Sequence, residues 1–338
     1  MSYTFVLFLI LLLLSNELLL KKNYFLDRIE HSKHKLFIND NIPTTGGLYL
    51  LFFLLFFYSD KNFIIFLYLF LIYLIGLSAD RLKNFSPKFR LFLQIIITFL
   101  FIENTETFIF DVRIDAINYL IDNYKIISIF FTIFCFIVLV NGTNFIDGNN
   151  LNAIGYYIIV YSIIYYLSKK FGLKLDLNFN LNIILFLSTL YLLNFLNKTQ
   201  LGDSGSYLLS FFSAFYTIEF INNNNFVSPY FAVLILWYPC FENLFSILRK
   251  FYQKKSISSA DNYHLHHCIY SFLKRKNFKS PNNLTGFIIN SVNFISLIIG
   301  MNYFNSTKYL TLIILINILV YIVIYNYLIK QNLRKKFF

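Results

Sequence analysis

The sequence predicts an all-α, polytopic integral membrane protein, and three observations support this fold class. Of the 338 residues, 57% are hydrophobic and only 14% are charged, whereas a soluble domain has about 25% charged residues. The mean hydropathy is +0.60. The apolar residues form runs of about 15 to 22, the length that an α-helix needs to cross a bilayer core. We therefore expect one membrane-embedded domain over residues 1–338, with about ten or eleven transmembrane helices.

The apolar runs predict the spanning helices in chain order. The first run lacks a basic amino-terminal region and a small-residue cleavage site, so we expect an uncleaved helix rather than a signal peptide. The run 47–58 is short, and 227–248 contains Pro229, Pro239 and Glu242, so these two are the least regular. The predicted segments are 3–20, 47–58, 62–78, 89–102, 126–140, 153–168, 181–196, 205–220, 227–248, 285–302 and 309–329.

The net charge of +12 would suggest a nucleic-acid partner in a soluble protein, but here we expect none. Lys and Arg accumulate in the cytoplasmic loops of membrane proteins. With the amino terminus outside, 22 of the 29 basic residues fall in loops on the inner side, and the loop 103–125 outside is acidic. We therefore predict an inner (plasma) membrane protein whose carboxyl terminus is cytoplasmic.

This orientation places every polar cluster that could carry chemistry on the predicted inner face. The clusters are 42–47, the region of Asp80, 141–150, 201–206 and 261–267. Scattered structural polar residues would not be sorted to one side in this way. The sequence therefore predicts one functional site at the cytoplasmic surface.

Residues 141–150 form a polar island between two apolar runs, which is costly in a membrane unless its groups are satisfied. Asn144 and Asp147 are oxygen donors three residues apart, and they share a face if the stretch is helical. Gly142 and Gly148 let the backbone approach a ligand closely. The alternative is a polar turn that only joins two helices.

The cluster at 202–206, Gly-Asp-Ser-Gly-Ser, precedes an apolar run. The free N–H groups at a helix start suit phosphate. Asp203 could bind Mg²⁺ there, or it could simply cap the helix. Asp80, which is followed by basic residues, could accept a proton, bind metal or form an ordinary surface ion pair.

Three histidines, His264, His266 and His267, lie in the long basic segment 249–284, which we expect to be a cytoplasmic loop. Their imidazoles could bind phosphate when protonated or contribute to a zinc site, although no obvious fourth ligand is near. A solvated histidine cluster is the third interpretation. The surrounding lysines and arginines could attract an anionic substrate or anchor the loop to anionic lipid head groups.

Taken in order, these stretches resemble the motifs of the polyprenyl-phosphate N-acetylhexosamine-1-phosphate transferase superfamily, which includes the phospho-MurNAc-pentapeptide translocase. The helix from Pro239 through Glu242 to Arg249 also resembles the family. The matching stretches are Pro43…Gly46-Gly47, Gly76…Asp80 with Ser86-Pro87…Arg90-Leu91, residues 141–150, residues 201–206 and Asp261-x-x-His264-Leu265-His266-His267.

The chain departs from the family pattern at three places. Ala79 stands where the family usually has a second acid beside Asp80, and Thr44 stands where it usually has Arg. Leu151-Asn152 replaces an expected Gly-Leu. The missing acid motivates one alternative, a catalytically inactive homologue that binds lipid phosphate. A membrane transporter is a further alternative, although the sequence shows no internal repeat with paired broken helices.

The resemblance implies transfer of a sugar-1-phosphate from a UDP-N-acetylhexosamine-type donor to undecaprenyl (polyprenyl) phosphate. UMP leaves, and the lipid-linked sugar diphosphate initiates synthesis of a cell-envelope polysaccharide such as lipopolysaccharide. Both substrates are anionic, so Mg²⁺ or Mn²⁺ is implied as cofactor. The expected partners are the UDP-sugar, the polyprenyl phosphate and membrane lipid, with a homodimer left open.

The resemblance also implies roles for particular residues. The catalytic candidates are acids and imidazoles, namely Asp80, Asp203, His264, His266 and His267. The metal candidates are Asp203 and Asn144. The substrate-binding candidates are Asp147, Asn150, Gly202, Ser206, Gly46, Gly47 and Lys83.

Overall fold

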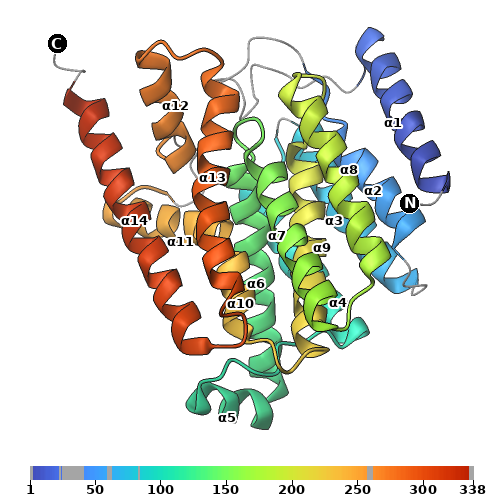
Figure 1. The fold of residues 1–338 in the computed structure, drawn as a ribbon, viewed down its shortest axis with the longest axis vertical. Helices are drawn as coiled ribbons and strands as arrows, with labels where there is room; N and C mark the ends of the chain where they lie inside the picture. The colour runs from blue at the N-terminus through green and yellow to red at the C-terminus, as the bar shows by residue number, and fades with distance from the viewer. Residues whose placement is uncertain are drawn as a thin grey trace.

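The computed structural model of the chain describes residues 3–22, 24, 42–58, 63–82, 84–256 and 262–334. Within these ranges it consists of fourteen α-helices without a strand (Figure 1), which confirms the predicted all-α class. The helices are α1 Tyr3–Lys21, α2 Gly46–Phe57, α3 Phe63–Arg81, α4 Pro87–Thr105, α5 Asp115–Asn123, α6 Lys125–Ile146, α7 Asn152–Phe171, α8 Leu177–Phe195, α9 Gly202–Asn222, α10 Pro229–Ile235, α11 Trp237–Tyr252, α12 Leu265–Arg275, α13 Pro281–Met301 and α14 Thr307–Arg334.

Every predicted apolar segment overlaps a helix, but fewer helices than expected are both long and apolar enough to cross a membrane. Among the described residues, six meet both conditions, or seven if the bent pair α10–α11 counts as one span. The six are α1, α3, α6, α8, α13 and α14. The 12-residue α2 is too short for a bilayer core of about 30 Å, whereas α4, α7 and α9 are long enough but carry more polar residues.

The central helix α9 shows why a long helix of this protein can be polar. It packs against α2, α3 and α6, and most of its residues are buried. Two of its serine hydroxyl groups are satisfied within the helix, since Ser210 Oγ donates to Ser206 O over 2.6 Å and Ser213 Oγ donates to Leu209 O over 2.7 Å. A helix that is enclosed by other helices does not need an apolar surface toward lipid.

Glycine permits the closest of these helix contacts. A Cβ added at Gly76 of α3 would lie 2.3 Å from Ser204 Cα of α9. The backbones of the two helices can therefore meet only because this position lacks a side chain. The contact brings the end of α3 directly against the start of α9.

The predicted irregular segment 227–248 is broken in the structure. α10 ends at Ile235 and α11 begins at Trp237, with a bend of 72° between them. α11 consequently lies across the bundle instead of along it (Figure 1). Gly142 of α6 lies against this crossing helix, because an added Cβ would be 2.0 Å from Pro239 O.

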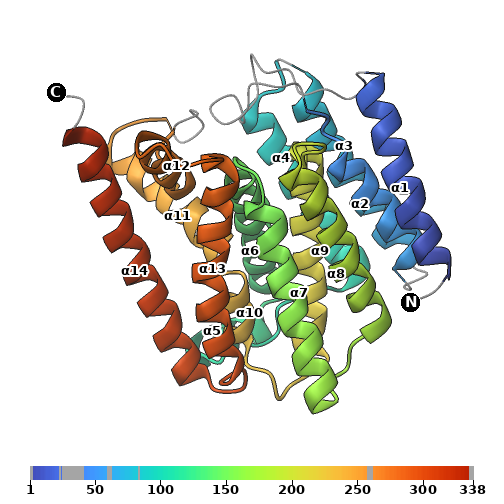
Figure 2. The same cartoon turned by 45° about the horizontal axis from the view of Figure 1, so that its top comes forward.

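Consecutive helices alternate in direction from α1 to α4 and from α6 to α9, so one end of the bundle gathers the segments that were predicted to be functional (Figures 1 and 2). α3, α6 and α8 end at the upper end of Figure 1, and α9 and α13 begin there, while α5 lies at the opposite end (Figures 1 and 2). α1 begins at the lower end and α14 ends at the upper end. This arrangement agrees with amino and carboxyl termini on opposite sides. The segment that we predicted as a cytoplasmic loop, 249–284, contains the helix α12.

Candidate functional site

The carboxyl end of α6 joins two polar groups of residues. On one side, Asn144 Nδ2 donates to Asp203 Oδ1 over 2.6 Å. On the other side, the Phe145 ring centroid lies 4.7 Å from that of His264, and a Cβ added at Gly148 would be 2.4 Å from His266 Nε2. The polar island therefore lies between two groups of polar residues. We call the group on α3, α4 and α9 the acid side, and the group on α11, α12 and α14 the histidine side.

Asp203 is the carboxylate of the acid side that bonds to two other polar side chains. Its Oδ2 accepts from Arg90 Nη1 over 3.1 Å, and the two side chains are 15% and 24% exposed, respectively. Asn144 Nδ2 also donates to Ser206 Oγ over 3.1 Å. A carboxylate, an amide and a guanidinium thus meet where solvent still has access, which is the environment that an anionic ligand with a cation requires.

Asp80 supports Asp203 through the backbone. Its Oδ1 accepts from Asp203 N over 2.8 Å and its Oδ2 accepts from Ser204 N over 3.0 Å. Two of the N–H groups that we expected to be free for phosphate are therefore already bonded to a carboxylate. Helix capping by Asp203, the alternative from the sequence, is wrong, because Leu201 occupies the N-cap position and Asp80 satisfies the helix start from another helix.

Gly202 makes this capping arrangement possible. Its φ is +73°, and an added Cβ would lie 2.9 Å from Asp80 Oδ2. Both the backbone conformation and the space therefore require glycine. Its role in the structure is to let the Asp80 carboxylate reach the start of α9.

Gly46 and Gly47, predicted to bind substrate, are buried at a helix contact. A Cβ at Gly46 would be 2.8 Å from Gln200 O, and one at Gly47 would be 2.5 Å from Gly205 N. Gly46 N also donates to Gln200 O over 3.0 Å. These contacts give both glycines a packing role that the sequence did not reveal, which is to bring α2 against the start of α9.

The side chain of Asn150 also connects elements. Its Nδ2 lies 2.6 Å from Asn197 Oδ1 and 2.9 Å from Asn283 Oδ1. These partners follow α8 and lie in the first turn of α13, so Asn150 ties the polar island to both. Asp147 is buried at 5% exposure, directly after α6. Lys83, the last predicted substrate-binding residue, lies outside the described residues.

The histidine side is buried, so the expectation of a solvated histidine cluster is wrong for two of its three members. His264 is 6% exposed and His266 is fully buried. The rings of His266 and His267 lie 4.2 Å apart, with His267 partly exposed. Asp261, the acid of the same motif, lies outside the described residues.

No site role was predicted from the sequence for two residues that the structure places here. Glu242 Oε1 lies 2.9 Å from His264 Nδ1, and Arg90 forms the ion pair with Asp203. Both had a signal in the sequence, because each belongs to a stretch that resembles a family motif. That signal could not identify their partners, which lie 22 and 113 residues away in the chain.

The acid side could bind Mg²⁺ only through few protein oxygens, with water and substrate completing the shell of the ion. Among the described residues, no group of three or more His, Cys, Asp or Glu side chains could hold a metal ion. Mg²⁺ commonly uses only one or two carboxylates and completes its shell with water and substrate phosphate. Asp203 is a carboxylate of this kind; Asn144 turns its amide nitrogen toward Asp203, so its amide oxygen would face a shared ion only after the amide rotates. In the described part of the chain the buried histidines form no closed zinc site.

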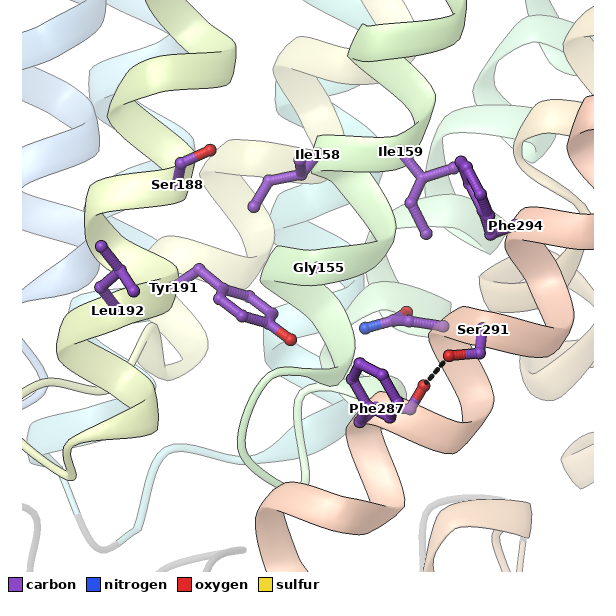
Figure 3. Close-up of a pocket in the computed structure, with 10 residues that line it drawn as sticks. Gly155, Ile158, Ile159, Ser188, Tyr191, Leu192, Phe287, Ser291 and Phe294 are labelled. Atoms are coloured by element: carbon purple, nitrogen blue, oxygen red, sulfur yellow. Dashed lines mark hydrogen bonds between the residues drawn. The ribbon is translucent and has the colours of Figure 1, made fainter.

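An apolar cleft lies away from the site, between α7, α8 and α13 (Figure 3). Its volume is about 450 Å³, and its walls include Ile158, Tyr191 and Phe287. Asn290 and Gly155 of its lining connect it to the residue that follows the polar island, because Asn290 Nδ2 and Gly155 N donate to Leu151 O over 2.8 and 2.9 Å. The cleft contains none of the charged residues that the proposed chemistry needs.

The fold and the site define a class, namely a helical membrane protein with a metal-compatible carboxylate and clustered histidines at one end. Residues 62–221 match the model of glycosyl transferase family 4. This stretch is just under half of the chain, and together with the two curated relatives described below it supports the predicted resemblance to the polyprenyl-phosphate hexosamine-1-phosphate transferase superfamily. The likeness is to sugar-phosphate transferases, the class that the motifs predicted.

Two curated relatives are similar to the chain. One is a probable undecaprenyl-phosphate N-acetylglucosaminyl 1-phosphate transferase of Bacillus subtilis, 30% identical over 146 residues, which are 42% of this chain and 40% of that protein. The other is the undecaprenyl-phosphate alpha-N-acetylglucosaminyl 1-phosphate transferase of Thermotoga maritima, 28% identical over 249 residues, 73% of each protein. The match thus spans less than half of the first relative and about three quarters of the second.

Proposed function

We propose that the protein transfers a sugar-1-phosphate from a UDP-N-acetylhexosamine-type donor to undecaprenyl phosphate or a similar polyprenyl phosphate. The observation that carries this proposal lies at the end of α6. On one side of it Asp203 bonds to Asn144 and Arg90, and on the other side the histidine segment, residues 264–267, packs against Phe145. The names of the two relatives support the same reaction. Its product would be a lipid-linked sugar diphosphate, the first intermediate of an envelope polysaccharide.

The reaction joins a phosphate oxygen of the lipid to the β-phosphorus of the nucleotide sugar, and the bond to the UMP oxygen breaks. A phosphate monoester has a second pKa of about 6 and is mostly ionised at neutral pH. The demand on a general base is therefore small. This is why Ala79, in place of the usual second acid, does not exclude catalysis.

Charge neutralisation is the larger demand, because two anions must approach each other. Asp203 and Asn144 would hold Mg²⁺ or Mn²⁺, which when bound would offset the charge of the diphosphate. Arg90 would then be free to pair with a substrate phosphate, since its present partner is the same carboxylate. His264, His266 and His267 would contact phosphate from the other side of α6.

The remaining predicted residues take supporting parts in this proposal. We assign a packing role to Asn150, Gly46, Gly47 and Gly202, because of their contacts. We assign to Asp80 the role of orienting the start of α9. Asp147, which is buried beside the histidine segment, is the residue that we assign to the nucleotide pocket. Ser206 holds Asn144 in place through their hydrogen bond.

A UMP-release assay tests the proposal. The purified protein in detergent is mixed with undecaprenyl phosphate, Mg²⁺ and either UDP-GlcNAc or UDP-GalNAc, and we expect UMP release that stops on chelation with EDTA. Binding of UDP-sugar without any UMP release would indicate the inactive homologue instead. UDP-sugar uptake into liposomes without UMP release would indicate the transporter.

A labelling experiment tests the proposed cytoplasmic position of the site in the inner membrane. Single cysteines replace the exposed Asn223 after α9 and the exposed Lys279 before α13, in a chain whose three native cysteines have been replaced. We expect a membrane-impermeant reagent to label Lys279→Cys only from the cytoplasm and Asn223→Cys only from outside. Labelling of Lys279→Cys from outside would contradict the proposed orientation.

A further inference from the structure

The last helix, α14, carries two tyrosines one turn apart that bond to Glu242 and Arg249 of α11, and these two residues in turn contact the segment of His264. We propose that Tyr321 and Glu242 are positioning residues that orient His264, and that Tyr325 and Arg249 hold the backbone next to it. The inference rests on the proposed function, because it concerns how the histidines are presented to phosphate. It gives α14, which the sequence marks only as a membrane span, a part in the site.

The first contact runs through a completely buried carboxylate. Glu242 is 0% exposed, and its Oε1 lies 2.9 Å from His264 Nδ1 and accepts from Leu265 N over 3.3 Å. Its Oε2 accepts from Tyr321 Oη over 2.8 Å. A buried carboxylate is costly unless donors surround it, and here three donors fix both of its oxygens.

This arrangement sets the proton position on His264. A carboxylate only accepts hydrogen bonds, so Nδ1 of the imidazole carries the hydrogen and donates. Nε2 is then the nitrogen through which His264 can act on other groups, and its ring plane is held by the Glu242 contact. Glu242 also bonds to the backbone at the start of α12, so the ring and the helix that carries His266 and His267 share one anchor.

The second contact holds the residue before His264. Arg249 donates to Tyr263 O, the carbonyl that precedes His264, and also to Tyr325 Oη over 3.0 Å and Ser246 Oγ over 3.2 Å. Arg249 is 8% exposed, and its bonds to Tyr325 and Ser246 are buried. The backbone is thus fixed on both sides of His264. Arg249 of α11, itself bonded to Tyr325 of α14, holds the carbonyl of Tyr263, and Glu242 holds the N–H of Leu265.

Aromatic packing makes the two tyrosines one unit. The rings of Tyr321 and Tyr325 are 6.1 Å apart with an interplanar angle of 8°. Phe245 of α11 packs against both, with centroid distances of 5.2 and 4.9 Å. Spacing of four residues places both hydroxyl groups on one face of α14, directed at α11. α14 also lies outside residues 62–221, the part that matches the family.

Kinetics can separate positioning from a general structural role. We expect Tyr321→Phe to lower kcat about tenfold, the usual cost of losing a residue that orients a functional group, with the KM for UDP-sugar changed less than about threefold. Tyr327→Phe, a matched change at an exposed residue of the same helix, should leave both constants unchanged. In a His264→Ala background, Tyr321→Phe should cause no further loss, because its effect passes through His264. An equal loss in both backgrounds would overturn the inference.

A second measurement does not depend on turnover. His264 modification by diethyl pyrocarbonate is followed by mass spectrometry in the intact protein. Loss of the Tyr321 hydrogen bond should raise its rate about fivefold, because one lost bond loosens the buried ring by about that factor. Glu242→Gln should raise it further, and Tyr327→Phe should leave it unchanged. Wild-type rates in Tyr321→Phe would overturn the inference even if UMP release confirms the proposed function. A raised rate in a protein that releases no UMP would overturn only the function.

Discussion

The acid side and the histidine side of the site are built differently. Asp203 and Arg90 are partly exposed and bond to each other, whereas Glu242 is fully buried beneath His264. A partly exposed ion pair contributes little to stability, about 0 to 1 kcal/mol, and can exchange partners. A buried carboxylate that loses a partner destabilises the fold. The acid side can therefore rearrange around substrate and metal, while the histidine side is held in one geometry.

The difference predicts that changes on the acid side mainly affect activity. Asp203→Asn should lower turnover by about 10³-fold or more, because a preorganised charge at the reacting phosphates is lost. The amide keeps the size of the side chain, so the melting temperature should change little. UMP release and thermal unfolding of the same preparation measure the two effects.

The control for Asp203→Asn is Asp176→Asn at the opposite end of the bundle. Asp176 caps α8 through Asn178 N and Phe179 N, and asparagine is also a good N-cap. Activity of this variant should stay at the wild-type level. Unchanged turnover in Asp203→Asn would contradict the assignment of the acid side.

On the histidine side, His267→Ala should lower turnover by about 10²-fold, the scale of losing one charge-stabilising donor. His266→Ala should lower turnover by a similar factor. It should also lower the melting temperature, because removal of the fully buried His266 ring leaves a cavity. Comparing melting temperatures of the two variants checks the difference in burial. Equal melting temperatures with wild-type turnover would show that neither ring contacts substrate.

Gly148→Ala tests whether the polar island positions the histidines. An added Cβ would lie 2.4 Å from His266 Nε2, so the ring must move, and we expect turnover to fall about tenfold, as for other disturbed positioning contacts. The double variant Gly148→Ala/His266→Ala removes this clash. Its turnover should equal that of His266→Ala alone, and a further loss would mean that Gly148 acts elsewhere.

The smallest effect is expected at Leu151, whose φ is +68°. A left-handed conformation costs a non-glycine residue about 1 to 2 kcal/mol, and Leu151 is also buried at 3% exposure. Leu151→Gly and Leu151→Ala both lose the buried side chain, but only glycine relieves the strain. Leu151→Gly should therefore unfold a few degrees above Leu151→Ala, and the reverse order in a thermal melt would contradict a strained backbone.

Leu151 also shows what a sequence pattern can and cannot say. The resemblance expects glycine at this position, and the structure supplies the reason in the positive φ between the polar island and α7. The departure was visible in the sequence, but its backbone conformation was not. Asn150 and Gly46 are similar cases, because the pattern predicted substrate binding for them, whereas their contacts in the structure connect and pack helices.

The sequence by itself determined the helical membrane class, the positions of the apolar helices and the order of the motifs, but not the short helices α5 and α12. Helix formation and membrane insertion depend on runs and periods of neighbouring residues, so composition and spacing are sufficient to predict them. Among the described residues, six or seven helices are both long and apolar enough to cross a membrane, fewer than the ten or eleven apolar runs, because a helix such as α9 that others enclose can be polar.

Only the tertiary structure decided which polar groups are partners. Asp80 caps a helix start 123 residues away, and Tyr321 bonds to Glu242 across 79 residues. Such pairs depend on how α3 meets α9 and how α11 bends beneath α14. No local pattern contains that information, because a hydrogen bond between distant segments forms only after the helices that carry them have packed.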